Sequence, residues 1–372
     1  PLRRRGSGGD VDVKIAILGA GAMATALTTP PTDNGHEVAL VGTHLDGEVI
    51  ESIRSTGRHP NLGLVVPPGV TAHPLDEAAA EFEGATHVLS AVNSFGVDWA
   101  GERLAGLLRP GMHVIAIAKG IQADDQGSFT ILPDVLAGKV PEPLRSAVSW
   151  TAIAGPSIAG ELAVRRHTSV VFASREEPAA QRWREVFATS YYHVRNSDDL
   201  LGVEVCACTK NCYALGLGFM GGVLDAEGPV DHPYVNFNYG AAMFGQASIE
   251  MRDFVTLLGG DPSVVLGLPG IGDCFVTSMG GRNVRIGRLV GAGLTFSQAR
   301  ATMPGVTLEG AAAIVVVGAA VERLTERGVI PADRFPLLRH LHDVVARDAA
   351  VDIPWHAFFG TDGSGRTTPN RP

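Results

Sequence analysis

The segment Lys14–Ala26 constrains the fold of this 372-residue chain more than any other. A run of four apolar residues, typical of a buried strand, leads into a G-x-G-x-x-A turn and then a helix. Gly19 allows the tight turn, Gly21 leaves room for a pyrophosphate, and Ala24 lets the helix pack closely on the strand. Such a turn also closes ordinary βα units. Because another strand follows at Glu37–Val41, and a helix N-terminus offers free N–H groups to phosphate, the segment favours dinucleotide binding.

Strand-like and helix-like segments alternate through the first half of the chain. Amphipathic stretches such as Asp46–Ser55 and Val97–Leu108 separate the strands. This alternation predicts an α/β domain, a Rossmann-like doubly wound parallel sheet whose ligands bind at the carboxyl ends of the strands. The expected strands are Lys14–Leu18, Glu37–Val41, Thr71–His73, His87–Ala91, His113–Ala116, Ser149–Ala154 and Ser169–Ala173. The loops expected at the binding edge are Gly19–Met23, Val92–Phe95, Ala118–Gly120 and Ala154–Ser157.

The pattern changes near Asp198, where long helical segments replace the strands. The expected helices are Leu200–Leu217, Tyr239–Leu258, Thr295–Thr302 and Thr307–Arg327. We therefore expect an all-α C-terminal domain, with an exposed loop at Gly221–Val235. The expected division is a flexible leader (1–11), a dinucleotide-binding domain (12–197), a helical substrate and catalytic domain (198–360) and a disordered tail (361–372).

Composition excludes several classes of partner. The formal net charge of −9 argues against a nucleic-acid partner. No apolar run is long enough to insert into a membrane, and the basic start lacks the apolar core of a signal peptide. The four cysteines lack zinc-site spacing and are expected to be reduced packing residues of a cytoplasmic protein. His340 and His342 are expected on a helix surface, and no metal is expected.

Two segments of the second half carry charged residues that need an explanation. Lys210 and Asn211 lie in a helix that is otherwise small and apolar. The lysine stem could snorkel to solvent, or the ammonium could be desolvated and able to transfer a proton. Pro269–Asn283 is glycine-rich and contains Asp273. Its Arg282, beside an asparagine after two glycines, suits a phosphate, although a helix-capping loop is the alternative. The residues alone leave both questions open.

Taken in order, these motifs resemble those of the NAD(P)-dependent glycerol-3-phosphate dehydrogenases. The resemblance extends from Lys14 to Ala346, and the order of the motifs carries more weight than any one of them. The matching segments are Gly19–Ala24, His59–Ala72, Lys119–Gly120, Gly155–Ser157 with Glu161, Asp198–Gly202, Lys210–Asn211, Asp273 to Asn283, and Val306–Gly310.

The resemblance implies a reaction and roles for individual residues. Lys210 would protonate the carbonyl oxygen of a small phosphorylated ketone, dihydroxyacetone phosphate, as hydride arrives from NAD or NADP. Asp273 would hold that lysine, and Lys119 would add a second positive charge. The implied substrate-binding residues are Asn211, Thr277, Arg282 and Asn283. The implied cofactor-binding residues are Gly19, Gly21, Ala22, Met23, Phe95, Lys119, Ser157, Ala159, Arg282 and Glu309. A homodimer is implied as well.

The chain also departs from the family's pattern. It has Val92–Asn93 in place of V-P, Ile158 in place of phenylalanine, and Gln246 in place of an arginine. These changes bear on the exact substrate more than on the reaction. Gly42–His44 carries neither the acid typical of NAD binding nor the arginine typical of NADP binding. One alternative is a reductase of another small phosphorylated or carboxylated keto compound, of the β-hydroxyacid or ketopantoate type, whose carboxylate Arg282 and Asn283 would bind. The other is a non-catalytic dinucleotide sensor.

Overall fold

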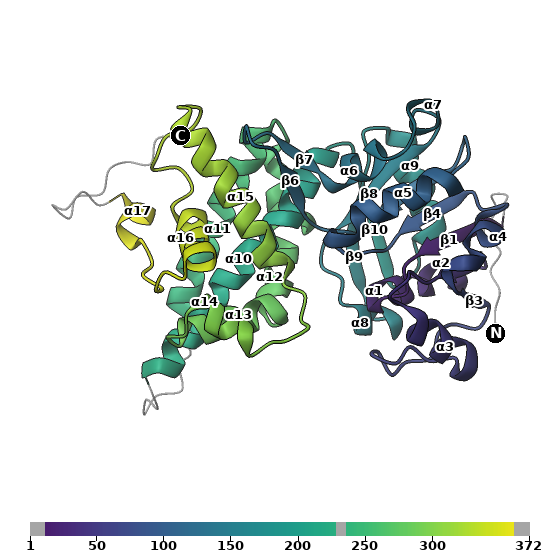
Figure 1. Cartoon of the computed structure of the whole chain (residues 1–372), viewed down its shortest axis with the longest axis horizontal. Coiled ribbons are helices and arrows are strands. Elements are labelled where there is room, and N and C mark those ends of the chain that lie inside the picture. The colour runs from purple at the N-terminus through teal and green to yellow at the C-terminus, as the bar shows by residue number, and fades with distance from the viewer. Residues whose placement is uncertain (1–11, 228–235, 361–372) are drawn as a thin grey trace.

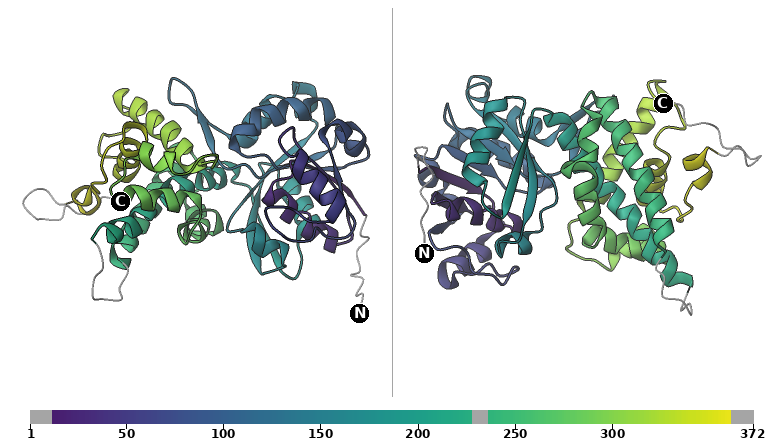
Figure 2. Two further views of the ribbon diagram at one scale, coloured as in Figure 1. Left: turned by 60° about the horizontal axis from the view of Figure 1, so that its bottom comes forward. Right: turned by 180° about the vertical axis from the view of Figure 1, so that it is seen from behind.

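The computed structural model describes residues 12–227 and 236–360, so the expected leader and tail lie outside the described residues. Two lobes lie side by side in every view (Figures 1 and 2), one built on a sheet and the other helical. The chain enters the helical lobe at α10 (Leu200–Glu227). This arrangement confirms the expected Rossmann-like sheet followed by helices.

The main sheet has eight strands in the order β10-β9-β8-β5-β4-β1-β2-β3. Six strands, from β8 to β3, are parallel, whereas β9 pairs antiparallel with β8 and β10 runs with β9. The sheet is therefore mixed at one edge, and β10 was not expected. The strands are β1 (Lys14–Leu18), β2 (Glu37–Val41), β3 (Val70–His73), β4 (His87–Ser90), β5 (His113–Ala116), β8 (Ser149–Ala154), β9 (Thr168–Ala173) and β10 (Tyr192–Ser197).

The register of the central strands places several loops at one edge. Leu18 of β1 pairs with Ser90 of β4, Ser90 with Ala116 of β5, and Ala116 with Ala152 of β8. The loops that follow these strands therefore leave the sheet close together, as expected for the binding edge of such a sheet.

Helices cover both faces of this sheet, and each face has its own apolar core. One core includes Trp183 and Phe187, and the other includes Phe82 and Leu104. The first face is covered by α1 (Ala22–Ala26), α3 (Gly47–Thr56), α8 (Ala159–Ala163) and α9 (Glu177–Phe187). The second is covered by α4 (Ala78–Phe82), α5 (Val97–Leu107) and α6 (Leu132–Gly138). The shorter elements are α2 (Thr29–Asp33), α7 (Glu142–Arg145), η1 (Leu75–Glu77) and η2 (Ser94–Gly96).

The helical lobe is built around α10, whose 28 residues are apolar on nearly all sides. A helix that is apolar all round needs neighbours all round, and α11, α12, α13 and α15 pack against it. The remaining elements are α11 (Phe237–Leu258), η3 (Pro262–Leu266), η4 (Leu268–Gly272), α12 (Asp273–Ser278), α13 (Arg282–Gly291), α14 (Phe296–Ala301), α15 (Glu309–Glu326), α16 (Pro336–Arg347) and α17 (Trp355–Phe359).

Four glycines bring α10 and α13 into backbone contact. A Cβ atom on Gly218 would lie 2.4 Å from the carbonyl oxygen of Val284, and one on Gly287 would lie 2.0 Å from that of Leu215. Gly222 and Gly291, one turn further along each helix, repeat the pattern. We call these four residues the glycine crossing. A side chain at any of them would force the two helices apart.

Two local expectations were wrong. Gly221–Val235 was expected to be a loop, but α10 continues through Glu227, and the rest of that segment lies outside the described residues. The helix persists because Gly222 admits α13, and Asp225 accepts a hydrogen bond from Nε of Arg288 at 2.6 Å. His342 was expected on a helix surface, but it is buried against α15, where its Nδ1 lies 3.2 Å from Oε1 of Glu322.

A short hairpin links the two lobes a second time. It consists of β6 (Ile121–Ala123) and β7 (Phe129–Ile131), which leave the sheet lobe and lie against α15. The carbonyl oxygen of Asp124 accepts a hydrogen bond from Arg323 of α15 at 3.2 Å. Among the described residues, no helix combines the length and apolarity needed to cross a membrane.

Replacing Gly19 by alanine should destabilise the protein. Gly19 has φ +115°, and an added Cβ would lie 2.7 Å from the carbonyl oxygen of Ala91. Backbone strain of this kind costs about 1–3 kcal/mol. We expect Gly19→Ala to lower the free energy of unfolding, measured in urea, by about that amount. Gly21→Ala is the matched control, because Gly21 has φ −65° and open space around it. Equal stability of the two variants would contradict this account of the turn.

Candidate active site

One carboxylate joins two lysines from different lobes. Lys210 of α10 donates from Nζ to Oδ1 of Asp273 at 2.7 Å and to Oγ1 of Thr277 at 2.7 Å. Lys119, in the loop after β5, donates to Oδ2 of the same Asp273 at 2.7 Å. Asp273 and Thr277 are one turn apart on α12, so one short helix supplies both acceptors. The structure thus brings together all three residues expected to be catalytic.

Burial sets the acidity of this cluster. Lys210 is 6% exposed and Asp273 is 2% exposed. Burial, the largest cause, and the nearby charge of Lys119 together lower the pKa of Lys210 to about 8, against the opposing effect of Asp273. Burial alone would raise the pKa of Asp273, but Lys119 and Lys210 outweigh it and hold that pKa below its ordinary value. An amine with a pKa near 8 can give or take a proton near neutral pH.

The expected substrate-binding residues lie around the cluster in two groups. Asn211 follows Lys210 on α10 and is buried, as is Asn283 at the start of α13. Both contact Gly310, since a Cβ there would lie 2.4 Å from the carbonyl oxygen of Asn211 and 2.8 Å from the Asn283 amide. Arg282, by contrast, is exposed at the start of α13, where its Nη2 lies 3.5 Å from Oε2 of Glu309. We call this exposed Arg282–Glu309 contact the rim of the site.

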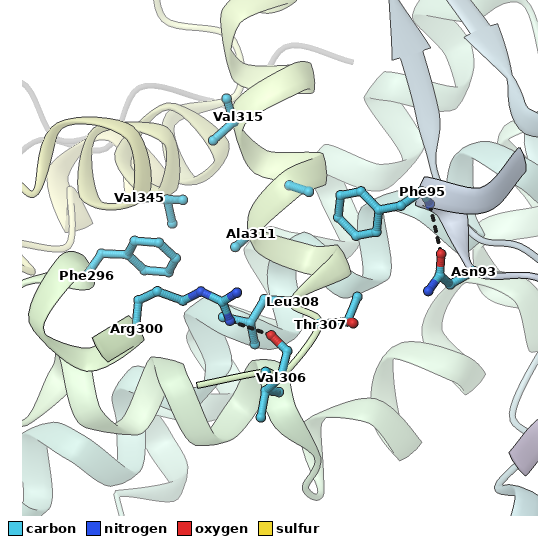
Figure 3. Close-up of a pocket in the computed structure, with 12 residues that line it drawn as sticks. Asn93, Phe95, Phe296, Arg300, Val306, Thr307, Leu308, Ala311, Val315 and Val345 are labelled. Atoms are coloured by element: carbon cyan, nitrogen blue, oxygen red, sulfur yellow. Dashed lines mark hydrogen bonds between the residues drawn. The ribbon is translucent and has the colours of Figure 1, made fainter. Parts of the chain in front are cut away.

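Glu309, the first residue of α15, connects the rim to the sheet lobe. Its Oε1 accepts hydrogen bonds from N and Oγ of Ser94 at 3.4 and 3.5 Å. Ser94 begins the short helix η2, and Asn93 caps that helix by accepting from the backbone N–H groups of Phe95 and Gly96. The Phe95 ring is 63% exposed and points toward the start of α15 (Figure 3).

The glycine turn has the room that a dinucleotide needs. A Cβ at Gly21 would meet nothing within 4 Å, whereas Gly19 lies against the loop after β4. Met23 of α1 lies beside the loop after β8, where Oγ of Ser157 donates to its sulfur at 3.9 Å. Ala22 begins α1 and Ala159 begins α8, and these two helices pack together. Met23, Ser157 and the starts of α1 and α8 therefore lie close to the glycine turn.

Sequence reasoning missed the role of Asp46 at this turn. The sequence places this residue only at the start of the amphipathic stretch Asp46–Ser55. Its Oδ2 accepts from the backbone N of Ala20 at 3.2 Å and from N and Oγ1 of Thr43 at 2.8 and 2.7 Å. The available signal was the three-residue spacing from Thr43 to Asp46, which lets a carboxylate fold back on the backbone. Asp46 thus fixes the glycine turn against the end of β2.

Gln246 takes part in a different network. It is buried, and its Nε2 donates to Oε1 of Glu250 at 2.9 Å. Glu250 also accepts from the hydroxyl of Tyr213 and from the backbone N of Leu337 and Leu338. These bonds tie α11 to α10 and to the start of α16. The change at Gln246 therefore alters a structural contact.

A pocket of about 540 Å³ lies beside the site, between Phe95 of the sheet lobe and Phe296, Arg300 and Thr307 of the helical lobe (Figure 3). Neither Lys210 nor Asp273 lines it. Residues 12–227 and 236–360 contain no group of three or more histidine, cysteine, aspartate or glutamate side chains suited to a metal ion.

Comparison with known families gives a match over most of the chain. Residues 14–180 match the family model described as the N-terminus of NAD-dependent glycerol-3-phosphate dehydrogenase, and residues 199–354 match that of its C-terminus.

Individual proteins agree with this match. An Archaeoglobus fulgidus protein named NADP(+)-dependent glycerol-3-phosphate dehydrogenase is 34% identical over 286 residues, covering 77% of this chain and 82% of its own. A Streptococcus pneumoniae glycerol-3-phosphate dehydrogenase (NAD(P)+) is 29% identical over 347 residues, covering 91% and 95%. The crystal structure of glycerol-3-phosphate dehydrogenase from Coxiella burnetii superposes with a TM-score of 0.74 at 26% identity, covering 93% of this chain and 98% of that one.

Asp273→Asn should destabilise the fold strongly, because it leaves two ammonium groups facing each other without a counter-charge. Removing one partner of a buried ion pair costs about 3–5 kcal/mol. We expect a loss of that order in the free energy of unfolding in urea at pH 7. Asp225→Asn removes the partner of Arg288 on the surface, where ion pairs contribute little, and serves as the control. A similar small loss for both variants would show that Asp273 does not hold the lysines in solution.

Proposed function

The chain belongs to the family of NAD-dependent glycerol-3-phosphate dehydrogenases, and we propose that it interconverts dihydroxyacetone phosphate and sn-glycerol 3-phosphate. It is an NAD(P)-dependent dehydrogenase. The observation that carries the proposal is the Lys210–Asp273–Lys119 cluster, whose Lys119 lies at the same edge of a Rossmann-like sheet as the glycine turn. A dinucleotide sensor without catalysis would not need a desolvated lysine.

The residues present fit the cofactor. Gly21 leaves open space where a pyrophosphate would approach the backbone, and Ala22 and Met23 begin the helix behind it. NAD or NADP, when bound, supplies the hydride. The expected contacts from Phe95, Ser157, Ala159 and Glu309 are supported by their places around the turn and at the rim.

Lys210 is the proposed general acid and base. In ketone reduction, negative charge develops on the carbonyl oxygen. The Nζ of Lys210 would stabilise this charge and then transfer its proton to the oxygen. In alcohol oxidation the neutral amine would remove the hydroxyl proton. Asp273 and Thr277 orient Nζ through bonds of 2.7 Å each, and Lys119 supplies a second positive charge.

The phosphate of the substrate is assigned to the start of α13. Arg282 has the planar fork that binds phosphate oxygens in pairs, and it is exposed at the rim. Asn283, Asn211 and Thr277 would donate from deeper in the site. Arg282 would also reach the cofactor, which the proximity of Glu309 and Ser94 supports.

We also propose that residues 12–197 bind the dinucleotide and that 198–360 form the catalytic domain. The end of β10 at Ser197 and the start of α10 at Leu200 support this division. A cytoplasmic location is supported by four cysteines that are all free and buried. The homodimer rests on the resemblance to the family.

A panel of ketones tests the proposed activity. We expect NADH or NADPH to be oxidised with dihydroxyacetone phosphate, because Arg282 and Asn283 suit a phosphate dianion. Carboxylated ketones such as ketopantoate should be poor substrates. The measurement is the loss of reduced-cofactor absorbance. Turnover of a carboxylated ketone without turnover of dihydroxyacetone phosphate would contradict the proposal.

The kcat values for reduction and oxidation should change in opposite directions as pH rises. Reduction needs the ammonium form of Lys210, so its kcat should fall as pH rises through about 8. Oxidation needs the neutral amine, so its kcat should rise over the same range. Both profiles are measured by steady-state kinetics at saturating substrates. If kcat instead fell with rising pH in both directions, or rose in both, Lys210 would be excluded as the titrating group.

Substitution separates the two lysines in the same experiment. Lys210→Met should lower kcat by about 10²–10⁴ and leave cofactor affinity unchanged, since it removes a general acid. Lys119→Met is the matched control and should be less damaging. The reverse order would identify Lys119 as the acid.

A further inference from the structure

Asp46 brings a carboxylate to the glycine turn, although no acid directly follows β2. One of its oxygens, Oδ2, accepts from the backbone N of Ala20, inside the turn, at 3.2 Å, and from N and Oγ1 of Thr43 at 2.8 and 2.7 Å. The other oxygen, Oδ1, makes no hydrogen bond within the described part of the chain, and the residue is only partly buried. Half of the carboxylate is therefore engaged by the turn, and half is left for a ligand.

The turn that receives this carboxylate is held from two sides. Nε2 of His59 lies 3.1 Å from the carbonyl oxygen of Ala20, and Nδ1 of the same ring accepts from the backbone N of Asn61 and Leu62. Because Nδ1 is an acceptor, Nε2 carries the proton and donates to Ala20. Asp46 thus fixes Ala20 at its N–H, and His59 fixes it at its carbonyl. The carboxylate keeps its place relative to the turn.

The end of β2 is where a Rossmann-like sheet distinguishes its cofactors. The pyrophosphate lies on the glycine turn, and the adenosine ribose reaches the end of the second strand, where an acid accepts from the ribose 2′-hydroxyl. The residues that directly follow β2, Gly42 to His44, include no acid. Asp46 lies further along the chain but folds back onto Ala20 and Thr43. The fold therefore supplies an acid at a place where the sequence pattern lacks one.

We propose that Asp46 selects between the two cofactors and that the protein prefers NAD(H) to NADP(H). Its Oδ1 would accept a hydrogen bond from the ribose 2′-hydroxyl of NAD(H). The same negative charge would repel the 2′-phosphate of NADP(H). This inference rests on the proposed function, because it takes the glycine turn as the place where the dinucleotide binds.

The charges of the same segment agree with this preference. From Gly42 to Ile50 the chain contains two acids, Asp46 and Glu48, and neither lysine nor arginine. Arg54, later in α3, is already paired with Glu77, with Nη1 and Oε1 3.5 Å apart. The segment that would face the 2′ position is thus acidic, which suits a hydroxyl better than a phosphate.

Arg103 of α5 is the cation that could oppose this preference. Its guanidinium carbon lies 5.9 Å from the centroid of the Trp99 ring, and His44 meets the same ring edge-on with centroids 5.1 Å apart. Trp99 therefore connects Arg103 to the loop after β2. A guanidinium group suits phosphate, so an experiment on cofactor choice has to include Arg103.

Titration with NADH and with NADPH, followed by the fluorescence of the reduced nicotinamide, tests the assignment without substrate. The wild-type protein should bind NADH more tightly. Asp46→Asn keeps an acceptor oxygen for the turn but removes the charge, so it should weaken NADH binding and strengthen NADPH binding. The ratio of the two dissociation constants should change by roughly ten- to hundredfold, the effect of one hydrogen bond to a charged group. A purely structural role would weaken both cofactors alike, and an unchanged ratio would overturn the proposal.

Two further variants separate Asp46 from its surroundings. Glu48→Gln removes the same charge two residues further along and should leave the ratio unchanged. Arg103→Gln should leave it unchanged as well, and a change as large as that of Asp46→Asn would overturn the proposal. If Asp46→Asn does not fold, the wild-type titration decides, because tighter binding of NADPH than of NADH would exclude the preference. If NADH binds but no phosphorylated ketone is reduced, the proposed function fails and the assignment of Asp46 stands.

Discussion

The site depends on one carboxylate that serves two cations from different lobes. Lys119 comes from the loop after β5 and Lys210 from the central helix of the other lobe, and both donate to Asp273 at 2.7 Å. Buried ion pairs add little net stability, because desolvation offsets their attraction. The effect of this ion pair is instead to position the Lys210 ammonium group. It brings an ammonium group with a lowered pKa to the edge where a Rossmann-like sheet holds its dinucleotide.

Much of the sheet lobe was predictable because buried parallel strands are short apolar runs that any sequence scan detects. Lys14–Leu18 and Glu37–Val41 are strands with the expected bounds. The strand at Tyr192–Ser197 was missed because it lies at the sheet edge, where exposed polar residues alternate with buried ones. The segment 221–227 was expected to be a loop because glycine weakens an isolated helix, and only the contact with α13 explains why it stays helical.

The site was predictable in part. Local sequence left Lys210 undecided between a surface and a buried position, since its burial depends on packing between distant helices. The resemblance to a family resolved that choice, and the comparisons confirm the family, the dehydrogenase activity and the use of NAD or NADP. The roles of individual residues remain predictions. Asp46 was missed because its spacing from Thr43 indicates only a local turn, and not that its carboxylate also accepts from the distant backbone N of Ala20.

The glycine crossing has a consequence for substrate selection. It presses α13 against α10 with no side chains between the two backbones, so neither helix can slide without a clash. Lys210 lies on one of these helices, and Arg282 and Asn283 begin the other. The spacing between the proposed proton donor and the proposed phosphate site is thus set by backbone contact. Under the proposed roles, the pair of helices would act as a rigid gauge of substrate length.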